Sequence, residues 1–321
     1  MSVWEQLPLT FKRKLIGKLD YKSRQSLSRC SRQNRALVGA APIRLTSATL
    51  TIVYEGASGN SGTVPILVLS ERVAGKNAVD GYYIETNVID NFVSIFKNRQ
   101  SKVDALCING HVREFYAFTA FIDKIIEQLE KLGAHFKIRA HKFDWCQEAH
   151  CVFNVTKVLG HVDEDVIDQL VLRFDMGPAM VRTLEKLAQW KRAKTIYVQK
   201  LVYTNFEPFL HFNRIKINNG TCSEDDIAAV VKSFISTPRP LGSFFQIKTS
   251  GDFEVRSILK KLDRMHLFLE TIEELRNENF ELEWNRRLIL CVMLQKRQVD
   301  GTICRKGHIL EDCEAPANYC I

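Results

Sequence analysis

The sequence predicts an α/β protein in which a short three-helix module precedes an irregular β–α solenoid with helices on one face. Residues 1–42 hold three short amphipathic segments, and from about residue 88 onward helical and strand-like segments alternate. Strands joined through helices must be parallel. The expected strands of this sequence alternate between apolar and polar residues, so we expect helices to cover only one face of the sheet. The expected divisions are 1–42 (three-helix module), 43–100 (linking hairpin and first helix), 101–285 (β/α repeat domain) and 286–321 (last strand and C-terminal tail).

The first forty-two residues carry start and stop signals for three helices. Pro8 suits the first turn of a helix, where its missing N–H needs no partner. Asp20 and Ser23 are candidate caps of a second helix, and a third ends near Gly39 and Pro42. Three helices this short cannot bury a self-sufficient core. We therefore expect their apolar stripe to face a partner.

The charge of the chain is concentrated in the same segment. Nine Lys or Arg residues lie within residues 1–42, opposed only by Glu5 and Asp20, so most of the net charge of +8 belongs there. A basic block on short amphipathic helices is typical of proteins that bind an acidic partner, which can be a protein, a nucleic acid or a membrane surface.

The run LPLTFKRKLIGKLDYKSRQSLSRCSRQNRALV, at residues 7–38, resembles an F-box. The resemblance rests on the opening Leu-Pro, the apolar positions behind it, the Leu-Asp that ends the first helix and the Ser23-Arg24 pair. Tyr21-Lys22 departs from the commonest pattern. The resemblance implies docking onto the small acidic adaptor of SCF-type (cullin-RING) ubiquitin ligases. The residues expected to contact the adaptor are Leu7, Pro8, Phe11, Leu15, Ile16 and Leu19.

Residues 43–100 predict a hairpin followed by a helix. Thr49–Tyr54 and Val64–Leu69 have strand character, and GASGNSG between them is a turn. This glycine-rich run is no phosphate loop, because no Gly-Lys-Ser/Thr closes it. A helix is expected over residues 88–96.

The repeat domain shows the clearest helix over residues 118–132, where an aromatic and aliphatic stripe ends at Gly133. Further helices are expected near 148–159, 178–190, 223–235 and 255–274. The arrangement resembles leucine-rich repeats. The six expected strands are marked by Leu106, Ile138, Leu170, Ile196, Ile215 and Phe245, which we expect to be buried against the helices.

Three segments of this region resemble the FTH domain of nematode F-box A proteins. They are VLGHVDEDVIDQLVLRFD, LEKLAQWKRAKTIYVQ and FLHFNRIKINNGTCSEDDIAAVVKSFI. In that family an F-box precedes such a domain. The resemblance implies the substrate-recognition subunit of an SCF-type ligase, a non-catalytic adaptor whose second domain recruits a client for ubiquitin-dependent degradation.

The sequence offers little for an enzyme. A nucleophile elbow, a Walker loop, a kinase set and a dinucleotide fingerprint are not found in it. We therefore expect no catalytic residue and no cofactor. The best candidate set of metal ligands lacks a paired Cys-x-x-Cys, so we also expect no bound metal. That candidate set is Cys304, His308, Cys313 and Cys320.

Cysteine usage predicts an intracellular location. The nine cysteines are scattered, and some, such as Cys107 and Cys291, stand inside apolar segments, which is typical of reduced thiols. No apolar run reaches the roughly eighteen residues of a membrane span, and no hydrophobic signal segment opens the chain. We expect a cytoplasmic or nuclear protein.

The open face of the expected sheet is the predicted client site. Residues beside the six strand marks turn to that face, and six of the eleven are Lys or Arg while none is acidic. This pattern predicts an acidic or phosphorylated client segment. A nucleic-acid-binding repeat protein and a scaffold without ligase function are the alternatives. The expected client-binding residues are Lys137, Arg139, Arg173, Tyr197, Arg214, Lys216 and Lys248.

Overall fold

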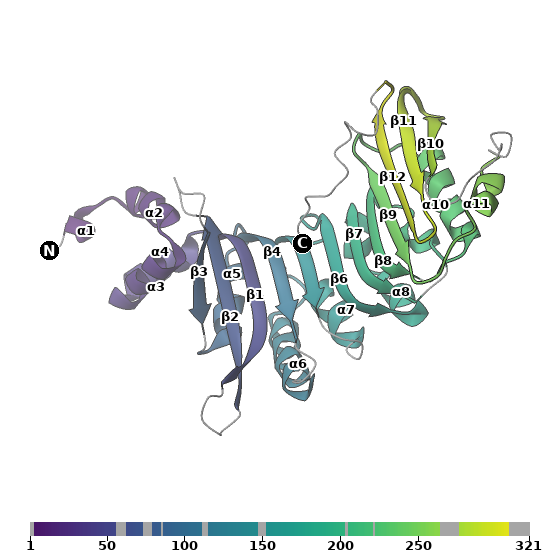
Figure 1. The fold of residues 1–321 in the computed structure, drawn as a ribbon. Helices are drawn as coiled ribbons and strands as arrows, with labels where there is room; N and C mark the ends of the chain where they lie inside the picture. The colour runs from purple at the N-terminus through teal and green to yellow at the C-terminus, as the bar shows by residue number, and fades with distance from the viewer. Residues whose placement is uncertain are drawn as a thin grey trace. The chain divides into compact units, whose positions relative to one another are not determined.

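The computed structural model describes residues 3–55, 62–72, 79–84, 86–110, 115–146, 152–202, 205–220, 222–263 and 276–307 (Figure 1). The chain divides into two compact units. The first is Met1–Val171 with Leu187–Arg192, and the second is Leu172–Lys186 with Ala193–Ile321. Each unit is described by itself. None of the helices that the structure describes is long and apolar enough to cross a membrane.

The first unit opens with a helical module, residues 3–42. Its second long helix begins as predicted, because the Asp20 carboxylate accepts a hydrogen bond from the Ser23 backbone N–H at 2.6 Å. Ser31 caps the next helix in the same way, from Asn34 N–H at 3.0 Å. Ser23 is thus the donor within a cap and not a cap itself. The helices are α1 (Val3–Gln6), α2 (Leu9–Lys18), α3 (Tyr21–Cys30) and α4 (Arg32–Ala40).

The module has a small apolar core of its own, which buries one member of the predicted stripe, Ile16, and leaves Phe11 exposed. Ile16 is completely buried with Leu37 and Val38, and Trp4 and Leu27 pack against this cluster. The short α1, which the sequence pattern did not predict, supplies Trp4 and so helps to cover α2 and α4.

The sheet of the first unit is mixed, with strand order β3-β2-β1-β4-β5. β1 pairs antiparallel with β2, as the predicted hairpin requires, and parallel with β4. β4 and β5 are parallel. The predicted linking hairpin is therefore part of the sheet and not a linker. The strands are β1 (Arg44–Glu55), β2 (Gly62–Arg72), β3 (Val79–Ile84), β4 (Lys102–Asn109) and β5 (Ala140–Cys146).

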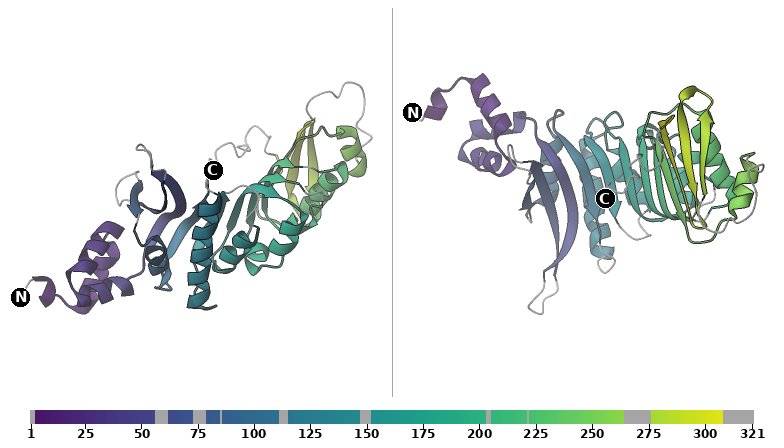
Figure 2. Two further views of the ribbon diagram at one scale, coloured as in Figure 1. Left: turned by 90° about the horizontal axis from the view of Figure 1, so that it is seen from below. Right: turned by 45° about the horizontal axis from the view of Figure 1, so that its top comes forward.

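Helices cover one face of this sheet, opposite an open face (Figure 2). Both predicted helices of residues 88–132 are present, and the apolar stripe of the longer one is buried except at Leu132. Gly133 ends that helix with a φ of 78°, a conformation that glycine adopts without strain. The helices here are α5 (Val88–Phe96), α6 (Phe115–Leu132), α7 (Val152–Gly160) and α9 (Ala188–Arg192).

The second unit continues with parallel strands and ends in antiparallel ones. β7, β8 and β9 are parallel, and the order onward is β9-β12-β11-β10 with antiparallel pairing. The division between the units falls within β6. The strands are β6 (Gln169–Met176), β7 (Thr195–Leu201), β8 (Arg214–Gly220), β9 (Phe244–Thr249), β10 (Arg276–Leu282), β11 (Asn285–Leu294) and β12 (Gln298–Arg305).

The helices of the second unit include the predicted one near residue 223. Ser223 caps it with a full capping box, because the Asp226 carboxylate accepts from the Ser223 N–H at 2.9 Å. Phe234 of this helix packs its ring edge-on against Phe245 of β9, with centroids 4.9 Å apart. The helices are α8 (Pro178–Leu184), α10 (Glu224–Ser236), α11 (Val255–Lys261) and the 3-10 turn Glu207–Phe209.

All six strand marks are buried, and the pairs β4–β5, β7–β8 and β8–β9 are parallel as predicted. Three expectations are wrong. Ile138 forms only an isolated bridge to Val162 and precedes β5. The helix expected at 178–190 is two helices, and β11 is not the last strand, because β12 follows it.

Candidate binding surfaces

The predicted adaptor-binding residues lie on α2 and the turns beside it. Pro8 is exposed and forms the N-terminal cap position of α2, and the Phe11 side chain is 47% exposed. Leu7, Leu15 and Leu19 are partly buried. Ile16 does not belong to this surface, because it is completely buried against α4.

Two members of the basic block are also internal. Arg24 is 5% exposed, and its guanidinium donates to the backbone carbonyls of Leu19 at 2.9 Å, Pro42 at 2.7 Å and Gly17 at 3.1 Å. Burial lowers the pKa of Arg24, although the nearby carboxylates oppose this effect. Arg24 therefore joins the end of α2 to the segment after α4.

Lys12 makes a similar contact at the other end of the module. Its ammonium donates to the Glu5 carbonyl at 3.1 Å and lies 5.8 Å from the centre of the Trp4 ring. The part of the basic block that faces solvent on α2 is therefore Arg13, Lys14 and Lys18.

The module is tied directly to the sheet that follows it. The Tyr21 N–H donates to the Glu71 carboxylate of β2 at 3.0 Å. The Ile43 N–H donates to the Ser101 hydroxyl at 2.9 Å, and the Asn98 amide donates to the Ala40 carbonyl at 2.7 Å. These contacts fix both ends of the short connection between α4 and β1.

In the second unit, Tyr197 on β7 organises part of the predicted client site. The Arg173 guanidinium lies 5.9 Å and the Lys216 ammonium 5.7 Å from the centre of its ring. The Asn218 amide donates to the Tyr197 hydroxyl at 3.0 Å. The Tyr197 side chain is 8% exposed, so these groups hold and cover the ring.

Tyr197 belongs to a row of paired residues on neighbouring strands, called here the Tyr197 row. This row ends in a carboxylate that the sequence pattern missed. Tyr197 pairs with Lys216, Lys216 with Gln246, and Gln246 with Asp300 of β12. Paired residues of neighbouring strands point to the same face. Asp300 was missed because no strand was expected to return beside β9, and a short alternation of apolar and polar residues after a turn is a weak signal of a strand.

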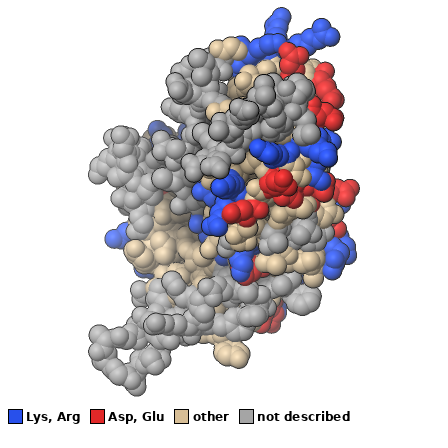
Figure 3. Space-filling model, turned by 45° about the vertical axis from the view of Figure 1, so that its right-hand side comes forward, with Lys and Arg blue, Asp and Glu red and all other residues tan. Residues whose placement is uncertain are grey.

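Arg214 and Lys248 are exposed but stand apart from the Tyr197 row. Arg214 pairs with Thr195 and Phe244, and Lys248 pairs with Gln298. In the view of Figure 3, Lys and Arg side chains are interspersed with Asp and Glu. Because Asp300 pairs with Gln246 of the same row, the predicted face is not purely basic.

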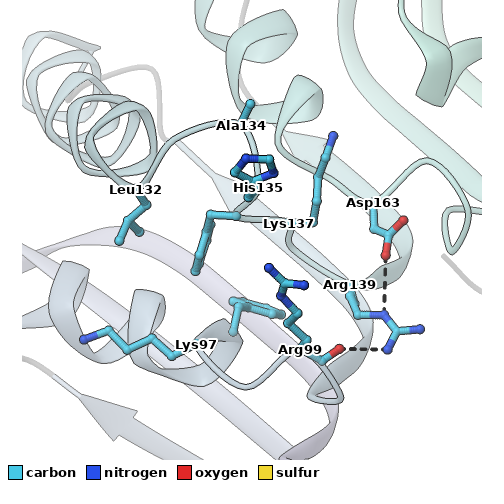
Figure 4. Close-up of a pocket in the computed structure, with 10 residues that line it drawn as sticks. Lys97, Arg99, Leu132, Ala134, His135, Lys137, Arg139 and Asp163 are labelled. Atoms are coloured by element: carbon cyan, nitrogen blue, oxygen red, sulfur yellow. Dashed lines mark hydrogen bonds and ion pairs between the residues drawn. The ribbon is translucent and has the colours of Figure 1, made fainter.

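Lys137 and Arg139 were expected on the same open sheet face, and this expectation is wrong. Both precede β5, since the strand begins at Ala140. Each is ion-paired: Lys137 Nζ lies 3.0 Å from Glu164 Oε2, and Arg139 Nε lies 3.4 Å from Asp163 Oδ2. They line a pocket in the first unit (Figure 4).

A comparison with protein-family models identifies a domain in the middle of the chain. Residues 119–273 match an FTH domain. The FTH domain contains β5 to β9, α10 and all seven predicted client-binding residues. The helical module lies outside it, and so do β10, β11 and β12. A comparison with curated proteins finds no match.

The C-terminal metal candidate is only partly described. Cys304 is a free cysteine that lies buried in β12. His308, Cys313 and Cys320 lie outside the described residues. Among the described residues, no group of three or more His, Cys, Asp or Glu side chains is placed to hold a metal ion.

Proposed function

We propose that this chain is the substrate-recognition subunit of an SCF-type ubiquitin ligase. Its helical module, as an F-box, docks on the acidic SCF adaptor and through it on cullin, and its FTH domain holds the client. The observation that carries the proposal is the FTH domain, a family associated with F-box proteins, behind a self-packed helical module with an F-box-like sequence. The one-sided solenoid predicted from strand alternation is part of the proposal.

The exposed side of α2 supports the docking part of the proposal. Pro8 and Phe11 present exposed apolar surface beside the partly buried Leu7, and Lys14 and Lys18 lie on the same helix face as Phe11, three and seven residues further along α2. An apolar centre with a charged rim is the usual composition of a specific protein interface. The basic rim complements an acidic adaptor and would accelerate its association.

The chemistry proposed for the chain is proximity and not catalysis. A bound client lysine held near a charged ubiquitin-conjugating enzyme reacts at a raised local concentration. The hydrogen bonds of Tyr21, Ile43 and Asn98 support this role, because they hold the docking module firmly on the first sheet. The proposed location is the cytosol or nucleus.

The proposed client surface is the row around Tyr197. Arg173 and Lys216 offer positive charge at one end of the row, and Asp300 stands two strands from Lys216, about 10 Å away. This arrangement suits an acidic client segment that contacts Arg173 and Lys216. Charge reversal at Arg173 and Lys216 should reduce client capture and leave adaptor binding unchanged. Client capture equal to that of the wild type would exclude this face.

Co-purification with the SCF adaptor tests the docking part. The Leu7→Ala/Pro8→Ala variant should lose binding, because truncation at the centre of an apolar patch can cost about 2 kcal/mol, or about thirtyfold in affinity. Val3→Ala is the matched control, since Val3 is 77% exposed and outside the predicted patch. Circular dichroism checks the fold of both variants. Undiminished binding by the double variant would refute the F-box assignment.

A nucleic-acid-binding repeat protein is the second candidate, and the basic module is the observation that favours it. Binding that falls steeply with salt, on random nucleic acid and without adaptor binding, would support this candidate. The burial of Lys12 and Arg24 weakens it, because these two cations are engaged with backbone carbonyls. A non-ligase scaffold would bind the adaptor without promoting client ubiquitylation.

A further inference from the structure

A pocket of about 600 Å³ opens in the first unit where the C-terminal ends of α5 and α6 meet the segment leading into β5 (Figure 4). Its apolar part is formed by Phe96, Leu132 and Phe136. Leu132 is 39% exposed, so apolar surface is accessible at the opening. The volume is in the range of pockets that hold small ligands or single side chains.

The charged side chains that line the pocket are mostly positive. Four lining residues are Lys or Arg, and Asp163 is the acidic one. Two of the cations are engaged, Lys137 with Glu164 and Arg139 with Asp163. Arg139 Nη1 also donates to the Arg99 carbonyl at 2.9 Å. These contacts brace the segment that leads into β5 against the loop that contains Arg99.

Arg99 is the cation that these contacts leave available. The Arg99 guanidinium points into the pocket, toward the segment that carries His135 (Figure 4). The Lys97 side chain extends away from the pocket. Among the described residues, the guanidinium of Arg99 and the imidazole of His135 have no hydrogen-bond or ion-pair partner. Both residues are exposed, so a ligand can reach them.

Stabilisation of helix ends does not account for this arrangement. Cations are favourable at helix C-termini. Lys97, at the cap position of α5, and Lys131, in the last turn of α6, fit that role. Arg99 lies beyond the end of α5, and its guanidinium is directed into the pocket (Figure 4).

We propose that this pocket binds a phosphate monoester carried on an apolar or aromatic group. Arg99 and His135 hold the phosphate, and Phe136 and Leu132 contact the organic part. The guanidinium fork suits a phosphate because it can donate two parallel hydrogen bonds to its oxygens. This site belongs to the first unit and the Tyr197 row to the second, and the proposal does not depend on the ligase function.

Isothermal titration calorimetry of the full chain at about 0.15 M salt tests the proposal. Phenyl phosphate should bind more tightly than inorganic phosphate, because only the former also contacts the apolar side. Arg99→Gln should weaken phenyl phosphate binding by about tenfold. It keeps the carbonyl that Arg139 contacts, so the loop should remain folded. His135→Gln is a second variant that should also weaken binding.

Lys131→Gln is the matched control, because it removes one positive charge near the pocket from a residue that does not line it. Its affinity should remain near that of the wild type. Equal losses in Lys131→Gln and Arg99→Gln would overturn the proposal, since they would indicate only long-range attraction. Failure of phenyl phosphate to bind the wild-type chain at millimolar concentration would also overturn it.

Two further probes distinguish a phosphorylated protein from a small molecule as the source of the phosphate monoester. A phosphotyrosine-containing peptide that binds more tightly than free O-phosphotyrosine would support the site and indicate a phosphorylated protein. Equal affinity for the two would support the site and indicate a small molecule. If Arg99→Gln binds both probes as tightly as the wild type does, the pocket is not the site.

Discussion

Substitution of Gly301 by alanine should destabilise the second unit through a direct clash with Phe245. Gly301 of β12 lies opposite Phe245 of β9. A Cβ atom at position 301 would lie 2.2 Å from both Cε1 and Cζ of the Phe245 ring. The ring has little room to move, because it is 1% exposed and packs edge-on against Phe234. Glycine is therefore required here by the close approach of an aromatic ring.

The magnitude follows from the size of this overlap. Carbon atoms in contact normally lie about 3.5–4.0 Å apart, so the ring or strand must shift by more than about 1 Å. Overpacking a rigid core costs about 1–3 kcal/mol. The loss of backbone freedom in the unfolded chain returns about 0.4–1 kcal/mol of stability to an alanine variant. We expect a net loss of about 1–2 kcal/mol.

Hydrogen exchange of the β9 and β12 amides measures this loss within the second unit. Gly251→Ala is the matched control, because a Cβ atom there meets nothing within 4 Å. In a Phe245→Leu background, Gly301→Ala should cost little, and the coupling between the two sites should be about 1–2 kcal/mol. If Gly301→Ala behaves as Gly251→Ala does, or if the two substitutions at positions 245 and 301 are additive, the clash argument is wrong.

Two further predictions concern the first unit. Arg24→Met removes three hydrogen bonds to backbone carbonyls, so the helical module should become sensitive to limited proteolysis and adaptor binding should fall although Phe11 is unchanged. Unaltered protease resistance would contradict this role. Burial lowers the pKa of His161, so the folded state favours the neutral imidazole and stability should fall as pH drops below about 6.5. His161→Gln should flatten that dependence in thermal melts between about pH 7 and about pH 5, and an unchanged slope would contradict the prediction.

The sequence predicted elements whose signals are local. The apolar stripe of α6, its glycine stop and the cap at Asp20 were all found as expected, because each depends on residues within a few positions of one another. Pairing between distant strands has no such signal. The parallel pairing of β1 with β4 and the return of β12 beside β9 are set by contacts across long stretches of chain.

The candidate sites were predictable only where they stand on a regular strand. Tyr197 and Lys216 were found through period-2 alternation, and the structure brings them together with Arg173. Alternation failed at Lys137 and Arg139, because it was extended beyond the true start of β5. The pocket at Arg99 had no sequence signal, since it is formed by two helix ends and a loop.

The pairing of β12 with β9 has a consequence for solubility. The FTH match ends at residue 273, before the three strands that cover the outer edge of β9. A fragment cut at that boundary would expose the backbone donors and acceptors of β9, as well as the Phe245 ring beneath Gly301. Open strand edges beside apolar side chains recruit other chains and aggregate. The C-terminal strands are thus a protective edge, and a soluble FTH fragment of this protein has to extend to residue 305.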